Sequence, residues 1–125
     1  RWLGAFTEFF DAGSIDPRYA VQSLCIRERV EHPQLLATNR HVTCGAPDLT
    51  EVKWEDATLR GESMLVGGDP YELYITEPAG YRLARFEADG AEVLANTVTG
   101  GMRTIRLRIE RSGHAKWHAR YDHTR

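Results

Sequence analysis

Turn-forming residues divide most of this chain into short segments, and this spacing constrains its fold more than any other feature. Clusters of glycine, proline and aspartate recur between Leu35 and Tyr121, and no segment between them sustains a helical period. Short strand-like runs separated by such turns are typical of antiparallel sandwiches and barrels, whereas parallel sheets need crossover helices. The sequence therefore predicts a mainly β fold, an antiparallel β-sandwich of the jelly-roll or Greek-key type.

Two turns stand out because each joins two clear strand patterns. Gly67–Pro70 follows a strand-like run from Leu59 to Val66. Ser112-Gly113 follows the run Met102–Arg111. We expect a β-hairpin at each of these turns. The expected strands are Ala20–Arg27, Leu35–Thr38, Leu49–Trp54, Ala57–Val66, Tyr71–Thr76, Tyr81–Glu87, Ala91–Val98, Met102–Arg111 and His114–Tyr121.

Alternation of apolar and polar side chains indicates which residues face inward. Ile105, Leu107 and Ile109 alternate with charged residues in one strand, and Trp117 lies on the apolar face of the next. The predicted core comprises Leu24, Ile26, Leu65, Leu73, Ile75, Ile105, Leu107, Ile109 and Trp117.

The N-terminal segment has a different pattern. Its large apolar residues, at positions 2, 3, 6, 9 and 10, have the spacing of an amphipathic helix over Trp2–Ala12. We therefore expect a short helix or a connection from a preceding domain at residues 1–18, a sandwich domain at 19–121 and a tail at 122–125. Because such an apolar face is not normally left in water, the chain is interpreted as a segment of a longer protein.

Size and charge exclude several classes of partner. A chain of 125 residues is the length of one domain. The formal net charge of −2 lacks the basic excess of a general nucleic-acid binder. No apolar run reaches the roughly 20 residues of a membrane-spanning helix. We therefore expect neither a nucleic acid nor a membrane as partner.

Two histidine-containing segments offer catalytic or metal-binding interpretations. Thr38–Val42, TNRHV, resembles the strand that carries the catalytic histidine of trypsin-like proteases, but no serine has the context of a nucleophile with an oxyanion hole. His41 and Cys44, or His114 and His118, have spacings found in zinc sites. In a strand, however, His114 and His118 would lie roughly 13 Å apart, too far to share one ion.

The remaining polar residues predict no chemistry. The acidic residues lie in or beside turns, where solvated carboxylates are ordinary, and spacing alone does not pair them for glycoside hydrolysis. Neither glycine pair has the lysine and helix of a phosphate loop. We therefore expect no catalytic residue, no metal and no cofactor. Cys25 and Cys44 are compatible with either a disulfide or two reduced thiols.

Aromatic residues give the better binding argument, because flat exposed rings stack on sugars. Tyr74 is expected to face outward, since Glu72 and Thr76 are its neighbours in the alternation. The candidate carbohydrate-binding residues are Tyr74 with Trp54 or Tyr81. Core packing is the competing role, and we expect it for Trp54 and for Trp117, which lies with Tyr71 and Tyr121 on the predicted inward face.

Residues 35–121 also resemble a known kind of domain. The order TNRHVTCG, a strand with Trp54, LRGESMLVGGDPYELYI, PAGY and a closing KWHARY is similar to the C-terminal β-sandwich domains of bacterial glycoside hydrolases, particularly α-galactosidase-like ones. The resemblance implies a non-catalytic accessory domain that packs on a preceding catalytic barrel of the same chain. Two alternatives stay open: an independent carbohydrate-binding module, and a small β-fold hydrolase or metal protein.

Overall fold

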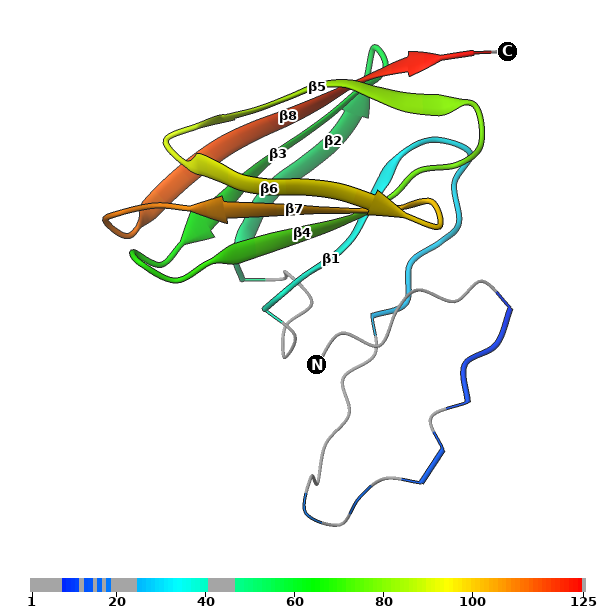
Figure 1. The fold of residues 1–125 in the computed structure, drawn as a ribbon, viewed down its shortest axis with the longest axis horizontal. Coiled ribbons are helices and arrows are strands. Elements are labelled where there is room, and N and C mark those ends of the chain that lie inside the picture. Colours follow the sequence, from blue (N-terminus) through cyan, green and yellow to red (C-terminus); the bar gives the residue numbers. More distant parts are fainter. Residues whose placement is uncertain are drawn as a thin grey trace.

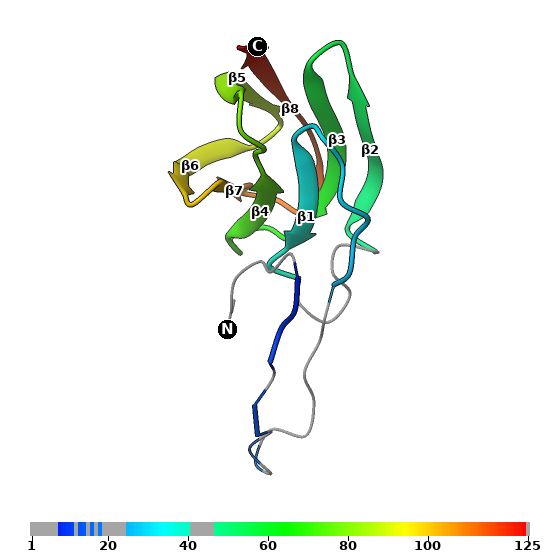
Figure 2. The ribbon, with the colours of Figure 1, turned by 90° about the vertical axis from the view of Figure 1, so that its right-hand side faces the viewer.

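The chain forms two four-stranded antiparallel sheets, in the orders β1-β4-β7-β6 and β2-β3-β8-β5. The computed structural model describes residues 8–11, 13–14, 16, 18, 25–40 and 47–124. Figures 1 and 2 show the two sheets lying face to face. The strands are β1 (Gln34–Thr38), β2 (Leu49–Glu55), β3 (Thr58–Leu65), β4 (Tyr71–Thr76), β5 (Tyr81–Asp89), β6 (Glu92–Thr99), β7 (Met102–Arg108) and β8 (Gly113–His123).

This architecture confirms the expectation of a mainly β, sandwich-like fold. All eight described strands overlap strands expected from the sequence, and β4 matches its expected bounds at both ends. β8 extends to His123, so the segment expected as a tail begins within a strand. The expected N-terminal helix lies mostly outside the described residues, and Glu8–Asp11 are not helical.

Both expected hairpins are wrong, because their strands lie in different sheets. β3 pairs with β2 and β8, whereas β4 pairs with β1 and β7, so Gly67–Pro70 carries the chain from one sheet to the other. The turn at Ser112-Gly113 likewise connects β7 to β8 across the sandwich. A tight turn reverses the chain in either case, and only the pairing partners decide between a hairpin and a crossing.

The true hairpins are β2–β3 and β6–β7. Asp56 and Ala57 turn the first with φ angles of 49° and 54°. Gly100 and Gly101 turn the second with φ angles of 57° and 76°. Two successive positive φ angles match the right-handed twist of the flanking strands, which favours a tight two-residue connection.

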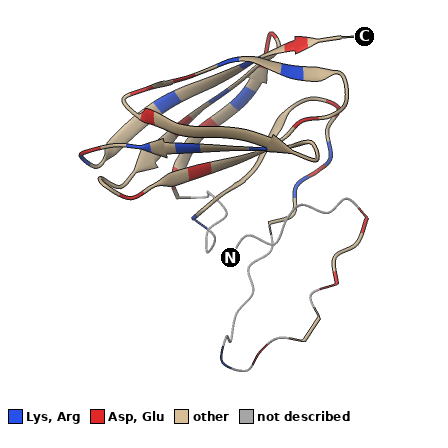
Figure 3. Cartoon of the chain, viewed as in Figure 1, with Lys and Arg blue, Asp and Glu red and all other residues tan. Residues whose placement is uncertain are grey.

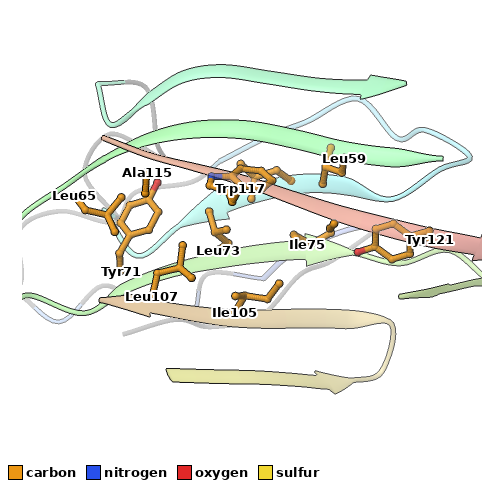
Figure 4. Close-up of a cluster of buried hydrophobic side chains, with 12 residues drawn as sticks. Leu59, Leu65, Tyr71, Leu73, Ile75, Ile105, Leu107, Ala115, Trp117 and Tyr121 are labelled. Atoms are coloured by element: carbon orange, nitrogen blue, oxygen red, sulfur yellow. The ribbon is translucent and has the colours of Figure 1, made fainter. Parts of the chain in front are cut away.

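The core lies between the sheets and contains most of the residues predicted for it. Leu73 and Ile75 from β4, with Ile105 and Leu107 from β7, face Leu65 of β3 and Trp117 of β8 (Figure 4). Ile109 packs partly buried against this cluster. The prediction is wrong for Ile26, which precedes β1 and is 89% exposed. Leu24 lies outside the described residues.

Trp117 is accommodated by a glycine on the neighbouring strand. Gly61 and Trp117 are register partners in β3 and β8, and the indole lies over the Gly61 backbone. A Cβ at position 61 would lie 2.6 Å from Trp117 Cε2. Because Gly61 has no side chain, it leaves the space that the Trp117 indole occupies.

Candidate functional site

Two of the three candidate binding residues meet at one end of the sandwich. The rings of Trp54 and Tyr81 are in edge-to-face contact, with centroids 5.7 Å apart. His32 stacks on Trp54 at 4.9 Å, and His123 stacks on Tyr81 at 4.4 Å. We call these four side chains, together with Tyr121, the aromatic cluster.

The strand register explains how the aromatic cluster forms. Trp54 pairs with Leu59 of β3, and Leu59 pairs with Ala119 of β8. Tyr81 begins β5 and pairs with His123 at the end of β8. The side chains of Trp54 and Tyr81 both point inward, so their rings lie at the same end of the core. Because His32, His123 and Tyr121 cover them, Trp54 and Tyr81 are only partly exposed.

Tyr74 lies apart from this cluster, on the outer face of the other sheet. The prediction that its ring is left in water is wrong, because Tyr74 is only 6% exposed. Its hydroxyl donates a hydrogen bond to Glu72, two residues earlier on the same face of β4. Burial, followed by the neighbouring Glu72 carboxylate, raises the pKa of Tyr74.

Glu72 also accepts two hydrogen bonds from Arg106 on β7. Burial alone would raise the pKa of Glu72, but the hydrogen bonds from Tyr74 and Arg106 outweigh burial and lower it. The three side chains form a compact polar group on the sheet surface. Its groups satisfy one another, so it offers no unpaired charge to a ligand.

A buried polar network surrounds Tyr71, at the opposite end of the core from Tyr121 (Figure 4). Tyr71 donates its hydroxyl proton to Asp48 Oδ2 across 2.6 Å, and Thr38 donates to the same oxygen at 3.0 Å. Ser63 Oγ lies 3.1 Å from the Tyr71 oxygen and 2.9 Å from Trp117 Nε1. Asp48, Thr38, Ser63 and Tyr71 are all buried. We call these five side chains the Asp48 network.

Proton counting fixes the direction of each bond in the Asp48 network. The indole N–H can only donate, so Trp117 donates to Ser63. Tyr71 has one proton, which Asp48 accepts, so Ser63 donates its own proton to the Tyr71 oxygen. The donors therefore run in one direction, from Trp117 through Ser63 and Tyr71 to the Asp48 carboxylate.

This direction argues against catalysis by Ser63 or Tyr71. A nucleophilic serine needs a base to accept its proton, and Ser63 instead donates to a phenol. Burial, followed by the Asp48 hydrogen bond, raises the pKa of Tyr71, which keeps its proton in place. One sequence feature points to this network. Ser63 alternates with Gly61 and Leu65 on the inward face of β3, and a serine at such a position indicates a hydrogen-bond partner in the core.

A second polar group lies beside the aromatic cluster. Arg103 of β7 pairs with Glu77, and their side chains are only 12% and 7% exposed. Arg103 also donates to Asn96 Oδ1 on β6. The buried Tyr121 hydroxyl makes no hydrogen bond, although burial and then the nearby Glu77 carboxylate raise its pKa. This ion pair closes the sandwich where β4 leads into β5.

The candidate metal ligands are not brought together. His114 and His118 lie on the outer face of β8, and each contacts a different acid: Glu62 at 3.0 Å and Glu87 at 3.3 Å. No group of three or more potential ligands occurs among the described residues. Cys25 is a free thiol that donates to the Leu36 carbonyl at 3.3 Å, and His41 and Cys44 lie outside the described residues.

No family model, no curated protein and no solved structure matches this chain. Within the described part of the chain, no helix has the length and hydropathy needed to cross a membrane.

Proposed function

We propose that this sandwich is a non-catalytic accessory domain that packs against a catalytic domain. The observation that carries the proposal is that, in the described part of the chain, the buried side chains capable of acid, base or nucleophilic chemistry, with the exception of Tyr121, bond to other side chains of the fold. Asp48, Ser63 and Tyr71 hold the two sheets together, while Glu77 pairs with Arg103. The resemblance of residues 35–121 to the β-sandwich domains of bacterial glycoside hydrolases indicates a carbohydrate-active enzyme as the parent protein.

The packing of the aromatic rings supports this function over that of a sugar-binding platform. A platform for stacking needs flat rings in a row on one sheet face. In the described residues, Tyr71, Tyr74, Trp117 and Tyr121 are buried, and Trp54 and Tyr81 contact other rings. Phe9 is 80% exposed and Ile26 is 89% exposed, and a neighbouring domain would remove both from water.

An independent carbohydrate-binding module is the second candidate. One observation favours it: Trp54 and Tyr81, both proposed from the sequence, are in contact and partly exposed. In this case the aromatic cluster would present ring edges to a sugar at the end of the sandwich. Replacing Trp54 by alanine would then abolish binding.

We also propose the jelly-roll or Greek-key type for the sandwich. Two neighbouring pairs support it: β4 lies beside β7 in one sheet, and β3 lies beside β8 in the other. The connections β3–β4 and β7–β8 both cross between the sheets. Interlocked crossings of this kind link the two sheets into one unit.

The test of the non-catalytic function is a hydrolysis assay with chromogenic galactosides and glucosides, run beside a glycoside hydrolase of known activity. We expect no turnover above the uncatalysed rate, with or without added divalent metals. Turnover that is lost in the Asp48→Asn variant, while that variant remains folded by circular dichroism, would replace the proposal with the small β-fold hydrolase.

A further inference from the structure

β6 differs from the other three edge strands of the sandwich. It pairs only with β7 among the described strands, and its other edge is open. Figure 2 shows β6 at the left margin of the molecule with no strand beyond it. An open edge presents unpaired backbone N–H and C=O groups, which are a template for another strand.

The other three edges carry features that oppose strand addition. β1 has only five residues, and its Leu36 carbonyl already accepts hydrogen bonds from Cys25 and Arg27. β2 contains Glu51, Lys53 and Glu55, and β5 contains Arg82, Arg85, Glu87 and Asp89. Charges along an edge strand disfavour pairing with a second chain.

β6 carries one charge, Glu92 at its first position, which pairs with Arg108 at 2.8 Å (Figure 3). The remaining residues are uncharged and rich in valine and threonine, which favour strands. Val98 is 51% exposed. The bulge between Val93 and Ala95 interrupts the regular edge, so the regular stretch is Ala95–Thr99.

We propose that Ala95–Thr99 is a homodimer interface, in which β6 pairs antiparallel with β6 of a second copy. The two-fold axis passes through Thr97, so that Thr97 faces its own copy. Asn96 then faces Val98, and Ala95 faces Thr99. The four-stranded sheets of the two copies join into one continuous sheet.

Self-complementarity identifies a second copy as the occupant. Antiparallel pairing about Thr97 places no charge opposite a like charge, because the stretch contains none. Threonine pairs across an antiparallel ladder are favourable, and the exposed Val98 is covered by the partner strand. The bulge lies outside the paired stretch at both ends of the dimer. This inference does not depend on the proposed function.

Sedimentation equilibrium across a concentration series tests the interface with a charge swap. The wild-type chain should approach twice its mass of 14.2 kDa. Thr97→Lys and Thr97→Glu each place two like charges face to face at the axis, so each variant alone should remain monomeric. An equimolar mixture of the two should dimerise again, because opposite charges then meet. Thr50→Lys, on the already charged edge β2, is the matched control and should dimerise like wild type.

Three results would overturn the proposal. A wild-type chain that stays monomeric throughout the series would show that the β6 edge does not self-associate. Dimers that persist in both Thr97 variants would place the interface elsewhere. Failure of the mixture to dimerise, with both variants folded by circular dichroism, would exclude a two-fold axis at Thr97.

Discussion

The Tyr71 hydroxyl donates a hydrogen bond to Asp48 Oδ2 across 2.6 Å, and this contact joins the two sheets of the sandwich. Tyr71 begins β4, whereas Asp48 immediately precedes β2 in the other sheet. Both side chains are buried. A buried carboxylate is costly unless hydrogen bonds satisfy it. Tyr71 and Thr38 both donate to Asp48 Oδ2, while the buried Oδ1 has no hydrogen-bond partner among the described residues, so the loss of either donor should be costly.

Tyr71→Phe should lower the free energy of unfolding by about 1–3 kcal/mol, because Asp48 loses one of its two donors and the Ser63 hydroxyl loses its acceptor in a buried site. Tyr121→Phe is the matched control, since the Tyr121 hydroxyl is buried without a hydrogen bond. That variant should stay within about 0.5 kcal/mol of wild type. Urea unfolding followed by tryptophan fluorescence measures both. Equal losses in the two variants would contradict the role of the Asp48 network.

Gly61→Ala should destabilise the protein by about 1–3 kcal/mol, because the new Cβ overlaps the Trp117 indole in a close-packed core. Gly113→Ala, also in sheet β2-β3-β8-β5, is the control: its nearest atoms, Arg111 O and Ile109 Cδ1, are both 3.9 Å away. Thermal unfolding of the two variants should separate them clearly. A wild-type melting temperature for Gly61→Ala would mean that Trp117 does not lie over position 61.

The lowered pKa of Glu72 predicts an acid-dependent loss of stability. Its pKa in the folded protein lies below its ordinary value of 4.5, so the unfolded state binds the proton more readily. The stabilisation by Glu72 is therefore complete above that ordinary value and is lost as the pH falls through the folded pKa.

Urea midpoints measured from neutral pH down to pH 3 test this dependence. They should fall less steeply in Glu72→Gln than in wild type, with the exposed Glu110→Gln as control. Parallel curves for all three proteins would exclude the Glu72 contribution.

The strands were predictable because alternation and turn chemistry are local signals. Alternation with polar neighbours predicts that four residues of β4 and β7 face the core, and all four are buried: Leu73, Ile75, Ile105 and Leu107. The pairing was not predictable in the same way. Gly67–Pro70 reverses the chain in a hairpin as readily as in a crossing, and the choice depends on β8 lying beside β3, a contact distant in sequence.

The candidate site was predictable only in part. Trp54 and Tyr81 are candidates because exposed aromatic rings stack on sugars, and the strand register brings the two rings together. The alternation with Glu72 and Thr76 predicts an exposed Tyr74, but a polar neighbour on the same face can instead bond to the tyrosine hydroxyl, as Glu72 does. The Asp48 network is not predictable from local patterns, because its members come from four different strands and from the residue before β2, and only the tertiary fold brings them together.

The central claim is that the aromatic rings stabilise the sandwich and do not bind glycan. Two-dimensional NMR of the tryptophan indole N–H signals tests it most directly, during titration with galactosides, glucans and acidic glycans. The account predicts that no indole signal shifts in a saturable manner. A saturable shift of the Trp54 signal, accompanied by heat of binding that is lost in both Trp54→Ala and Tyr81→Ala, would contradict the account and establish a carbohydrate-binding module.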